Sequence, residues 1–146
     1  MKIGKDFVGI TTPFYCHDGE GNFVLHKRSA NCRDEQGRWD PGAGQLELSA
    51  SLEENALREV REEYGCRGEI VGRLPAHDIF REQEGVMTHW VAIPFFIRVK
   101  REEVKINEPD KIDEIGWFRL DHLPKPLHTG FARSLELFKE EFQKYK

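Results

Sequence analysis

The chain has 146 residues, of which 33% are charged and 38% hydrophobic, and its formal net charge is −4. This length predicts a single domain over residues 1–146, and the composition is that of an ordinary globular protein. A negative net charge provides no basic field for nucleic acid, so we expect no nucleic-acid partner. The apolar runs are too short to cross a bilayer and the N-terminus lacks a signal-peptide core, so we expect no membrane association.

The cysteines and histidines indicate neither a disulfide framework nor a zinc site. Cys16, Cys32 and Cys66 are odd in number and lack a Cys-x-x-Cys spacing, which favours reduced thiols in a cytoplasm. The six histidines are scattered, with no His-x-x-x-His pair, so zinc has little support. The sequence leaves the oligomeric state open, with a homodimer among the alternatives.

Periodicity and turn chemistry predict an alternation of strands and helices along the chain. In chain order, the predicted elements are a strand at 6–15, a strand at 23–27, a polar loop at 28–40, a helix at 51–64, strands at 69–74, 88–99 and 114–120, and a helix at 131–145. The strand at 88–99 is nearly continuous in apolar residues and is therefore expected to be central. Two helices around a mixed sheet predict an α/β/α sandwich.

The helix at 51–64 has well-defined ends and one buried face. Ser51 and Glu54 form a Ser-x-x-Glu capping box, and Gly65 stands where a left-handed residue ends a helix. Its apolar positions form a stripe that we expect to be buried, made of Ala56, Leu57, Val60 and Tyr64.

Three carboxylates lie beside this stripe. Glu59, Glu62 and Glu63 are spaced so that a helix gathers them on one face, where each like-charge pair costs roughly 0.2–0.5 kcal/mol. A divalent cation would reverse that cost. Magnesium prefers oxygen ligands, commonly one or two carboxylates together with a substrate phosphate. The cluster therefore predicts a magnesium site for a phosphate-bearing ligand, in preference to a merely solvated acidic face.

The surrounding residues resemble the Nudix box, which the family writes as Gly-x5-Glu-x7-Arg-Glu-aliphatic-x-Glu-Glu-x-Gly-aliphatic. The residues in register, within a box at about 44–66, are Gly44, Arg58, Glu59, Val60, Glu62, Glu63 and Gly65, with Cys66 at the last apolar position. The resemblance identifies the chain as similar to the Nudix (MutT-type) hydrolases. It implies a Nudix-like α/β/α sandwich with a mixed β-sheet between helices.

The resemblance also implies roles for individual residues. Glu59, Glu62 and Glu63 would be metal ligands, joined by the backbone carbonyl near Ala43. Arg58 would hold the carboxylates through charge-assisted hydrogen bonds. The cofactor would be Mg²⁺, with Mn²⁺ as the alternative.

The first half of the motif departs from the family pattern. Ala50 replaces the first glutamate, which in the family usually supports the arginine or the outer shell of the metal site. Ser49 replaces the glycine before it, and Ala43 replaces one glycine of a Gly-Gly pair. Glu47 does match an acidic position common in the family. Because outer-shell groups often change activity 10–100-fold, these departures weaken the inference to full activity.

The resemblance continues outside the box. Leu25-His-Lys-Arg28 resembles the family's second strand, so Lys27 and Arg28, together with Gly44, are candidates for binding substrate phosphates. Asn107-Glu-Pro-Asp-Lys111 resembles a segment of Nudix proteins that hydrolyse nucleoside triphosphates. Patterns for ADP-ribose, dinucleoside polyphosphates and NADH are absent. A small nucleotide-type substrate, with a nucleoside triphosphate favoured, is therefore expected.

The chemistry implied is attack of water on phosphorus, which splits a diphosphate linkage with the help of the metal. A general base has to lie within about 2.6–3.2 Å of that water. Glu59 or Glu63 in the box, and Glu108 or Glu114 in a later segment, are the candidates. Glu108 has the better setting, beside Pro109 in a loop.

Three kinds of protein fit the sequence. The favoured one is a magnesium-dependent pyrophosphohydrolase. The second is a catalytically weak Nudix-fold module that binds a ligand or regulates a partner, motivated by Ala43, Ser49 and Ala50. The third, an isopentenyl-diphosphate isomerase-like enzyme, is disfavoured because Gly42-Ala-Gly-Gln45 contains no cysteine.

Overall fold

The computed structural model describes residues 1–146 and contains nine strands, three α-helices and one 3-10 helix. In chain order these are β1 (Gly9–His17), β2 (Asn22–Arg28), β3 (Trp39–Asp40), β4 (Ala43–Gln45), α1 (Leu52–Tyr64), β5 (Gly68–Arg73), β6 (His77–Gln83), β7 (Val86–Ala92), β8 (Phe95–Val99), η1 (Arg101–Glu103), β9 (Ile112–Arg119), α2 (Thr129–Leu137) and α3 (Lys139–Gln143). No helix among them is long and apolar enough to cross a membrane.

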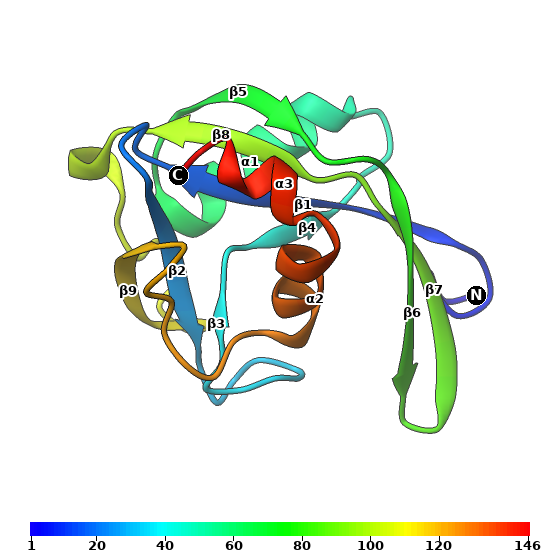
Figure 1. Cartoon of the computed structure of the whole chain (residues 1–146). Helices are drawn as coiled ribbons and strands as arrows, with labels where there is room; N and C mark the ends of the chain where they lie inside the picture. Colours follow the sequence, from blue (N-terminus) through cyan, green and yellow to red (C-terminus); the bar gives the residue numbers. More distant parts are fainter.

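Strand β1 organises a mixed sheet. Its first half pairs in parallel with β7 and antiparallel with β4, and its second half pairs in parallel with β8 and, at His17, antiparallel with β2. Antiparallel pairs then extend the sheet from β2 to β3 and β9, and from β8 to β5. Strands β6 and β7 form a long hairpin that reaches away from the body of the molecule (Figure 1).

Two hydrophobic cores lie on opposite faces of this sheet, because successive side chains of a strand point to opposite sides. Phe14 and Cys16 of β1 pack with Val60 of α1, whereas Tyr15 packs with Phe131 of α2 and Phe142 of α3. In the view of Figure 1, α2 and α3 lie in front of the sheet and α1 lies behind it. The predicted α/β/α sandwich with a mixed sheet is therefore confirmed.

Helix α1 forms as its local sequence predicts. Ser51 is extended at the N-cap and its hydroxyl accepts from the backbone N–H of Glu54, while Gly65 ends the helix in the left-handed conformation with φ 63°. Ala56, Val60 and Tyr64 are buried, as expected, but Leu57 is only partly buried. A polar residue, Asn55, is fully buried on the same side.

Two predicted elements are divided in the structure, and three strands were not predicted. The strand predicted at 88–99 is two strands, β7 and β8, because Pro94 cannot donate to a ladder and the chain changes partner there. Strands β3, β4 and β6 were not predicted. The helix predicted at 131–145 is divided at Phe138, whose φ −118° and ψ 34° are not helical, so the structure has three α-helices where the sequence predicted two.

Candidate active site

Glu59 lies against the β4 strand, and the absence of a side chain at Gly44 makes room for it. A Cβ built on Gly44 would overlap Cγ and Cδ of Glu59. The Glu59 side chain is only 16% exposed. Burial, followed by the charge of Glu62, raises the pKa of Glu59 above its usual value. A carboxylate in this position is one that a cation would stabilise.

Glu63 is the most enclosed carboxylate of the helix. Its side chain is 12% exposed and its Oε2 is buried without a hydrogen-bond partner. Burial raises the pKa of Glu63 well above the usual value, and the charges of Asp40, Glu59 and Glu108 raise it further. Such an unpartnered buried carboxylate oxygen is rare in proteins and calls for a ligand.

Glu62 and Arg58 lie at the more open side of the cluster. Glu62 is 51% exposed and its Oε1 lies 3.7 Å from Arg58 Nε. The same guanidinium lies 3.4 Å from Glu59 Oε1 and 3.4 Å from Glu47 Oε2. Arg58 therefore balances the charge of several carboxylates at once.

The loop after η1 brings Glu108 to this cluster. Asn107 donates from its side chain to the backbone carbonyls of Arg61 and Glu62 at 3.2 and 3.0 Å, and from its backbone to Glu63 O at 3.1 Å. These bonds cap the C-terminal end of α1. They fix the neighbouring Glu108, half-buried, close enough for its charge to raise the pKa of both Glu59 and Glu63.

His26, on β2, extends the site beneath the helix. The Tyr64 hydroxyl donates to Pro41 O at 2.8 Å, so it accepts from His26 Nδ1 at 2.7 Å. His26 Nε2 then faces Asp40 Oδ2 and Glu63 Oε1, each at 3.9 Å. Burial lowers the pKa of His26.

Asp40 stays ionised in this setting. Burial alone would raise its pKa, but His26, His128, Arg28 and a bond from Gly42 N–H outweigh burial and lower it. The carboxylate at position 40 is therefore one source of the field that acts on the neighbouring Glu63.

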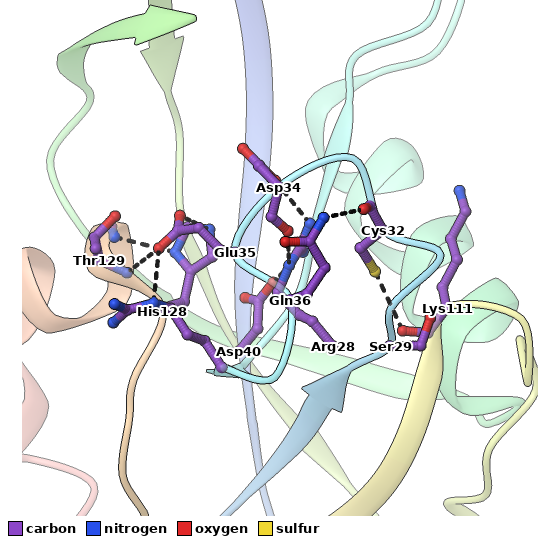
Figure 2. Close-up of polar contacts among 12 residues, drawn as sticks. Arg28, Ser29, Cys32, Asp34, Glu35, Gln36, Asp40, Lys111, His128 and Thr129 are labelled. Carbon is purple, nitrogen blue, oxygen red and sulfur yellow. Dashed lines mark hydrogen bonds and ion pairs between the residues drawn. The ribbon is translucent and has the colours of Figure 1, made fainter.

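The loop between β2 and β3 is tied down by ion pairs at the edge of the site (Figure 2). Arg28 donates to Asp40 Oδ2 at 2.8 Å and to Asp34 Oδ1 at 2.9 Å. Glu35 accepts from Arg81 Nη2 at 2.7 Å and from the backbone N–H of Thr129 at 2.8 Å. Its Oε2 also lies 2.8 Å from Nε2 of His128.

Arg28 and Lys27, the predicted phosphate-binding residues, lie at the end of β2. The Arg28 guanidinium forms ion pairs with Asp34 and Asp40, and these contacts hold the Asp40 carboxylate in place. Lys27 pairs with Glu114 across β2 and β9. By strand alternation, the side chains of Lys27 and its partner Glu114 point to the face that α2 covers, opposite α1. Neither Lys27 nor Glu114 joins the α1 carboxylates, and the phosphate-binding role of Lys27 and Arg28 stays a prediction.

Sequence reasoning missed three residues of the site, namely His26, Asp40 and Asn55. Asp40 lies in the segment Trp39-Asp-Pro-Gly42, directly before the box, and this position could have signalled it. A histidine inside the apolar run of β2 and an asparagine on the buried side of α1 were the other available signals. Each is a polar group in an apolar pattern, which burial makes costly unless it has partners.

The donor set was compared with the needs of a divalent cation. No three His, Cys, Asp or Glu side chains are close enough together to hold a metal ion by themselves. Magnesium takes several ligands from water and substrate, so a few carboxylates suffice. The Ala43 carbonyl fits too, because the carbonyls of Gly42 and Gly44 bond to β1 and alternation directs that of Ala43 away from it. The chemistry of these oxygens fits magnesium.

Comparisons with known proteins identify the family to which this fold belongs. The NUDIX domain family model matches residues 10–138. The crystal structure of the MutT NUDIX hydrolase from Burkholderia pseudomallei gives a TM-score of 0.78 at 28% identity, covering 90% of this chain and 98% of that chain. The crystal structure of a MutT protein from Methanosarcina mazei Go1 gives a TM-score of 0.73 at 26% identity, covering 96% of this chain and 98% of that chain.

A curated relative comes from Mycobacterium tuberculosis (strain CDC 1551 / Oshkosh), where it is provisionally named mutator protein MutT4. It is 30% identical over 104 residues, which make up 70% of this chain and 42% of that protein. The chain thus spans less than half the length of this relative. The comparisons support the predicted enzyme class, a hydrolase acting on phosphorus-containing acid anhydrides. With the family model matched over most of the sequence, the chain belongs to the NUDIX domain family.

Proposed function

We propose that this chain is a Mg²⁺-dependent pyrophosphohydrolase that cleaves a diphosphate linkage in a nucleoside diphosphate-linked substrate. The observation that carries the proposal is Glu63. Its Oε2 is buried without a partner, and its pKa is raised by burial and by Asp40, Glu59 and Glu108. A cation relieves this repulsion, and a phosphate-bearing ligand completes the cation's coordination.

Glu59, Glu62, Glu63 and the Ala43 carbonyl would hold the magnesium ion. When bound, magnesium supplies positive charge that neutralises phosphate oxygens and makes a water more acidic. Gly44 leaves the space in which the Glu59 carboxylate lies. Arg58 orients the carboxylates from the solvent side, where Glu62 is open to solvent.

Glu108 is the residue that we assign as general base. It is half-buried, it lies near both Glu59 and Glu63, and the bonds of Asn107 fix its loop to the end of α1. Pro109 restricts Glu108 to extended conformations, which favours a fixed aim for its carboxylate. It would accept the proton of the water that attacks phosphorus. Glu114 does not compete for this role because it lies on the opposite face of the sheet.

A nucleoside triphosphate is the substrate that we favour. The segment Asn107-Glu-Pro-Asp-Lys111 resembles that of Nudix proteins that hydrolyse nucleoside triphosphates, and in this fold it carries both the helix cap and the proposed base. We place the enzyme in a cytoplasm, where the three unpaired cysteines would stay reduced.

The second candidate, a weak Nudix-fold binding module, is motivated by Ala50. If loss of the first box glutamate left Arg58 without support, the cluster would be poorly organised. Arg58 instead donates to Asn55 and lies beside Glu47. This observation favours the enzyme over the module.

Purified protein should be screened with magnesium against nucleoside triphosphates, nucleotide sugars and dinucleoside polyphosphates, with detection of phosphate and pyrophosphate. We expect metal-dependent turnover, with nucleoside triphosphates the best class. Binding of a nucleotide without turnover would favour the module. Turnover that persists in excess EDTA would contradict the proposal.

A further inference from the structure

Asn55 is a fully buried polar residue on α1, one turn before Arg58. Its Oδ1 accepts from Arg58 Nη2 at 2.6 Å and from the backbone N–H of Glu47 at 3.2 Å. Its Nδ2 donates to Thr12 Oγ1 at 2.9 Å. The amide thus uses both of its ends and links α1 to β1 and to the segment that follows β4.

The orientation of this amide is fixed by its partners. The Thr12 hydroxyl donates to Gly44 O at 3.3 Å, so it has a lone pair but no proton for Asn55. The amide nitrogen therefore faces Thr12 and the amide oxygen faces Arg58. This leaves Asn55 Oδ1 as a fixed, uncharged acceptor that points at the guanidinium.

The contact with Asn55 is the closest that the Arg58 guanidinium makes to any side chain. The carboxylates of Glu47, Glu59 and Glu62 lie 3.4, 3.4 and 3.7 Å away. Position 50 has only a methyl side chain and offers no acceptor. Asn55 therefore sets the direction of the guanidinium, and the carboxylates share its charge at longer range.

We propose that Asn55 is a positioning residue of the carboxylate site, which holds Arg58 where it orients Glu59 and Glu62 without capturing either of them. A free guanidinium pairs bidentately with a carboxylate, and such a pair would compete with a divalent cation for the same oxygens. A neutral acceptor holds the guanidinium and leaves the negative charge of the carboxylates to the cation. This inference rests on the proposed metal-dependent function. Asn55 would hold Arg58 in place in a chain that has alanine and not glutamate at position 50.

The test compares Asn55→Ala and Asn55→Leu, which remove the acceptor, with Asn55→Asp, which retains it. Leucine is close to asparagine in size and fills the space that alanine leaves. Ser134→Ala is the matched control: Ser134 is buried on α2, close to Tyr15 of the other core, on the far face of the sheet. This variant loses a buried polar group without touching α1.

Two measurements distinguish a change in the position of Arg58 from a loss of stability of the whole protein. Mn²⁺ binding is measured directly by the loss of its free-ion electron paramagnetic resonance signal, and thermal melts record folding. We expect Asn55→Ala and Asn55→Leu to weaken Mn²⁺ binding by about 10-fold or more, the scale of groups that orient metal ligands. Asn55→Asp should bind within a few-fold of wild type, and Ser134→Ala should bind as wild type does despite a lower melting temperature.

A second arm follows hydrolysis as magnesium is titrated. In the variants without an acceptor, we expect the magnesium concentration for half-maximal rate to rise about 10-fold, with less change in the rate at saturation. Unchanged Mn²⁺ binding in the folded Asn55→Ala or Asn55→Leu protein would overturn the inference. So would loss of binding in an Asn55→Asp protein that melts at the wild-type temperature, since this variant keeps the acceptor for Arg58. If wild type itself neither binds Mn²⁺ nor hydrolyses any substrate, the proposed function fails first, which is a distinct outcome.

Discussion

Gly44 and Glu59 are in direct contact across the space between β4 and α1, and a single methyl group at position 44 would overlap the Glu59 side chain. Gly44 has no positive φ, so its role is spatial and not conformational. The first glycine of the box motif and its first helix carboxylate are therefore two halves of one structural feature. They are fifteen positions apart in sequence, and the cap at Ser51 with the first two turns of α1 brings them together.

Gly44→Ala should displace the Glu59 carboxylate while leaving the fold intact. Because backbone conformation permits alanine here, the cost falls on the contact with Glu59 Cγ and Cδ. We expect a fall of about 10–100-fold in kcat/KM and a higher magnesium requirement, since a misplaced ligand carboxylate has effects on this scale. Steady-state kinetics of Gly44→Ala measures both effects, with circular dichroism as the control for folding. If the variant has the kinetics of wild type, Glu59 is not part of the site.

Glu63→Gln should abolish most turnover but stabilise the metal-free protein. Burial and three neighbouring carboxylates raise the pKa of Glu63, so its ionisation opposes folding once the pH exceeds the ordinary value. In EDTA at neutral pH we expect the melting temperature to rise by about 2–4 °C, the shift that about 1 kcal/mol gives in a domain near this size. A lower melting temperature in EDTA would show that Glu63 is not under repulsion.

Glu62→Gln should lose most of the activity with a smaller change in stability. Glu62 is half exposed, so solvent already screens its charge. A paired comparison of Glu62→Gln and Glu63→Gln in the same melts therefore separates the open from the enclosed ligand. Full activity in both variants would contradict the assignment of the helix carboxylates as metal ligands.

Glu108→Gln should cost 10²-fold or more in kcat, the scale expected of positioned proton transfer. Asn107 remains in this variant, so the cap on α1 and the position of the loop are kept. Glu114→Gln is the informative comparison, because Glu114 lies on the other face of the sheet and should have nearly wild-type kcat. Near-wild-type turnover of Glu108→Gln would return the general base to Glu59 or Glu63.

Glu35→Gln should destabilise the protein in a pH-dependent way. Burial acts to raise the pKa of Glu35, but bonds from Thr129 and the charges of His128 and Arg81 lower it below the usual 4.5. Its ionised form thus contributes stability above pH 4.5, and the contribution is lost as the pH falls below 4.5 through the folded-state pKa. At neutral pH we expect the free energy of unfolding of Glu35→Gln to be about 1 kcal/mol lower than that of wild type.

Urea unfolding between pH 3 and 7 measures this gap. The difference between wild type and Glu35→Gln should be constant above about pH 5 and shrink on further acidification. Glu82→Gln, which removes an exposed carboxylate from β6, should show no such trend. A gap that is independent of pH down to pH 3 would contradict the role of Glu35.

Local chemistry explains what the sequence could predict. Ser51, Glu54 and Gly65 fix the ends of α1 within the helix itself, so its boundaries agree with the structure to one residue. The strands at β1, β2, β5 and β9 follow from patterns a few residues long. By contrast, β6 places Ile79 and Phe80 side by side among polar residues, and Phe80 is exposed. The hairpin projects from the core and lacks a clear apolar face.

Convergence in space explains what could not be predicted. His26, Asp40 and Asn55 come from β2, β3 and α1, and each matters through a partner distant in sequence, such as Tyr64 for His26 and Thr12 for Asn55. A pattern along one element cannot name such a partner. The ion pairs of Arg28 with Asp34 and Asp40 are of the same kind, because the sequence gives no sign of which carboxylates the fold brings to this guanidinium.

The most direct test of the account is the magnesium dependence of nucleoside triphosphate hydrolysis in wild type and in the double variant Glu59→Gln/Glu63→Gln, both shown to be folded. We predict that wild type releases phosphate or pyrophosphate only when magnesium is added, and that its rate saturates as the magnesium concentration rises. The double variant should show no saturable dependence at any magnesium concentration. Equal, magnesium-saturable turnover by the two proteins would contradict the claim that the α1 carboxylates form the catalytic metal site.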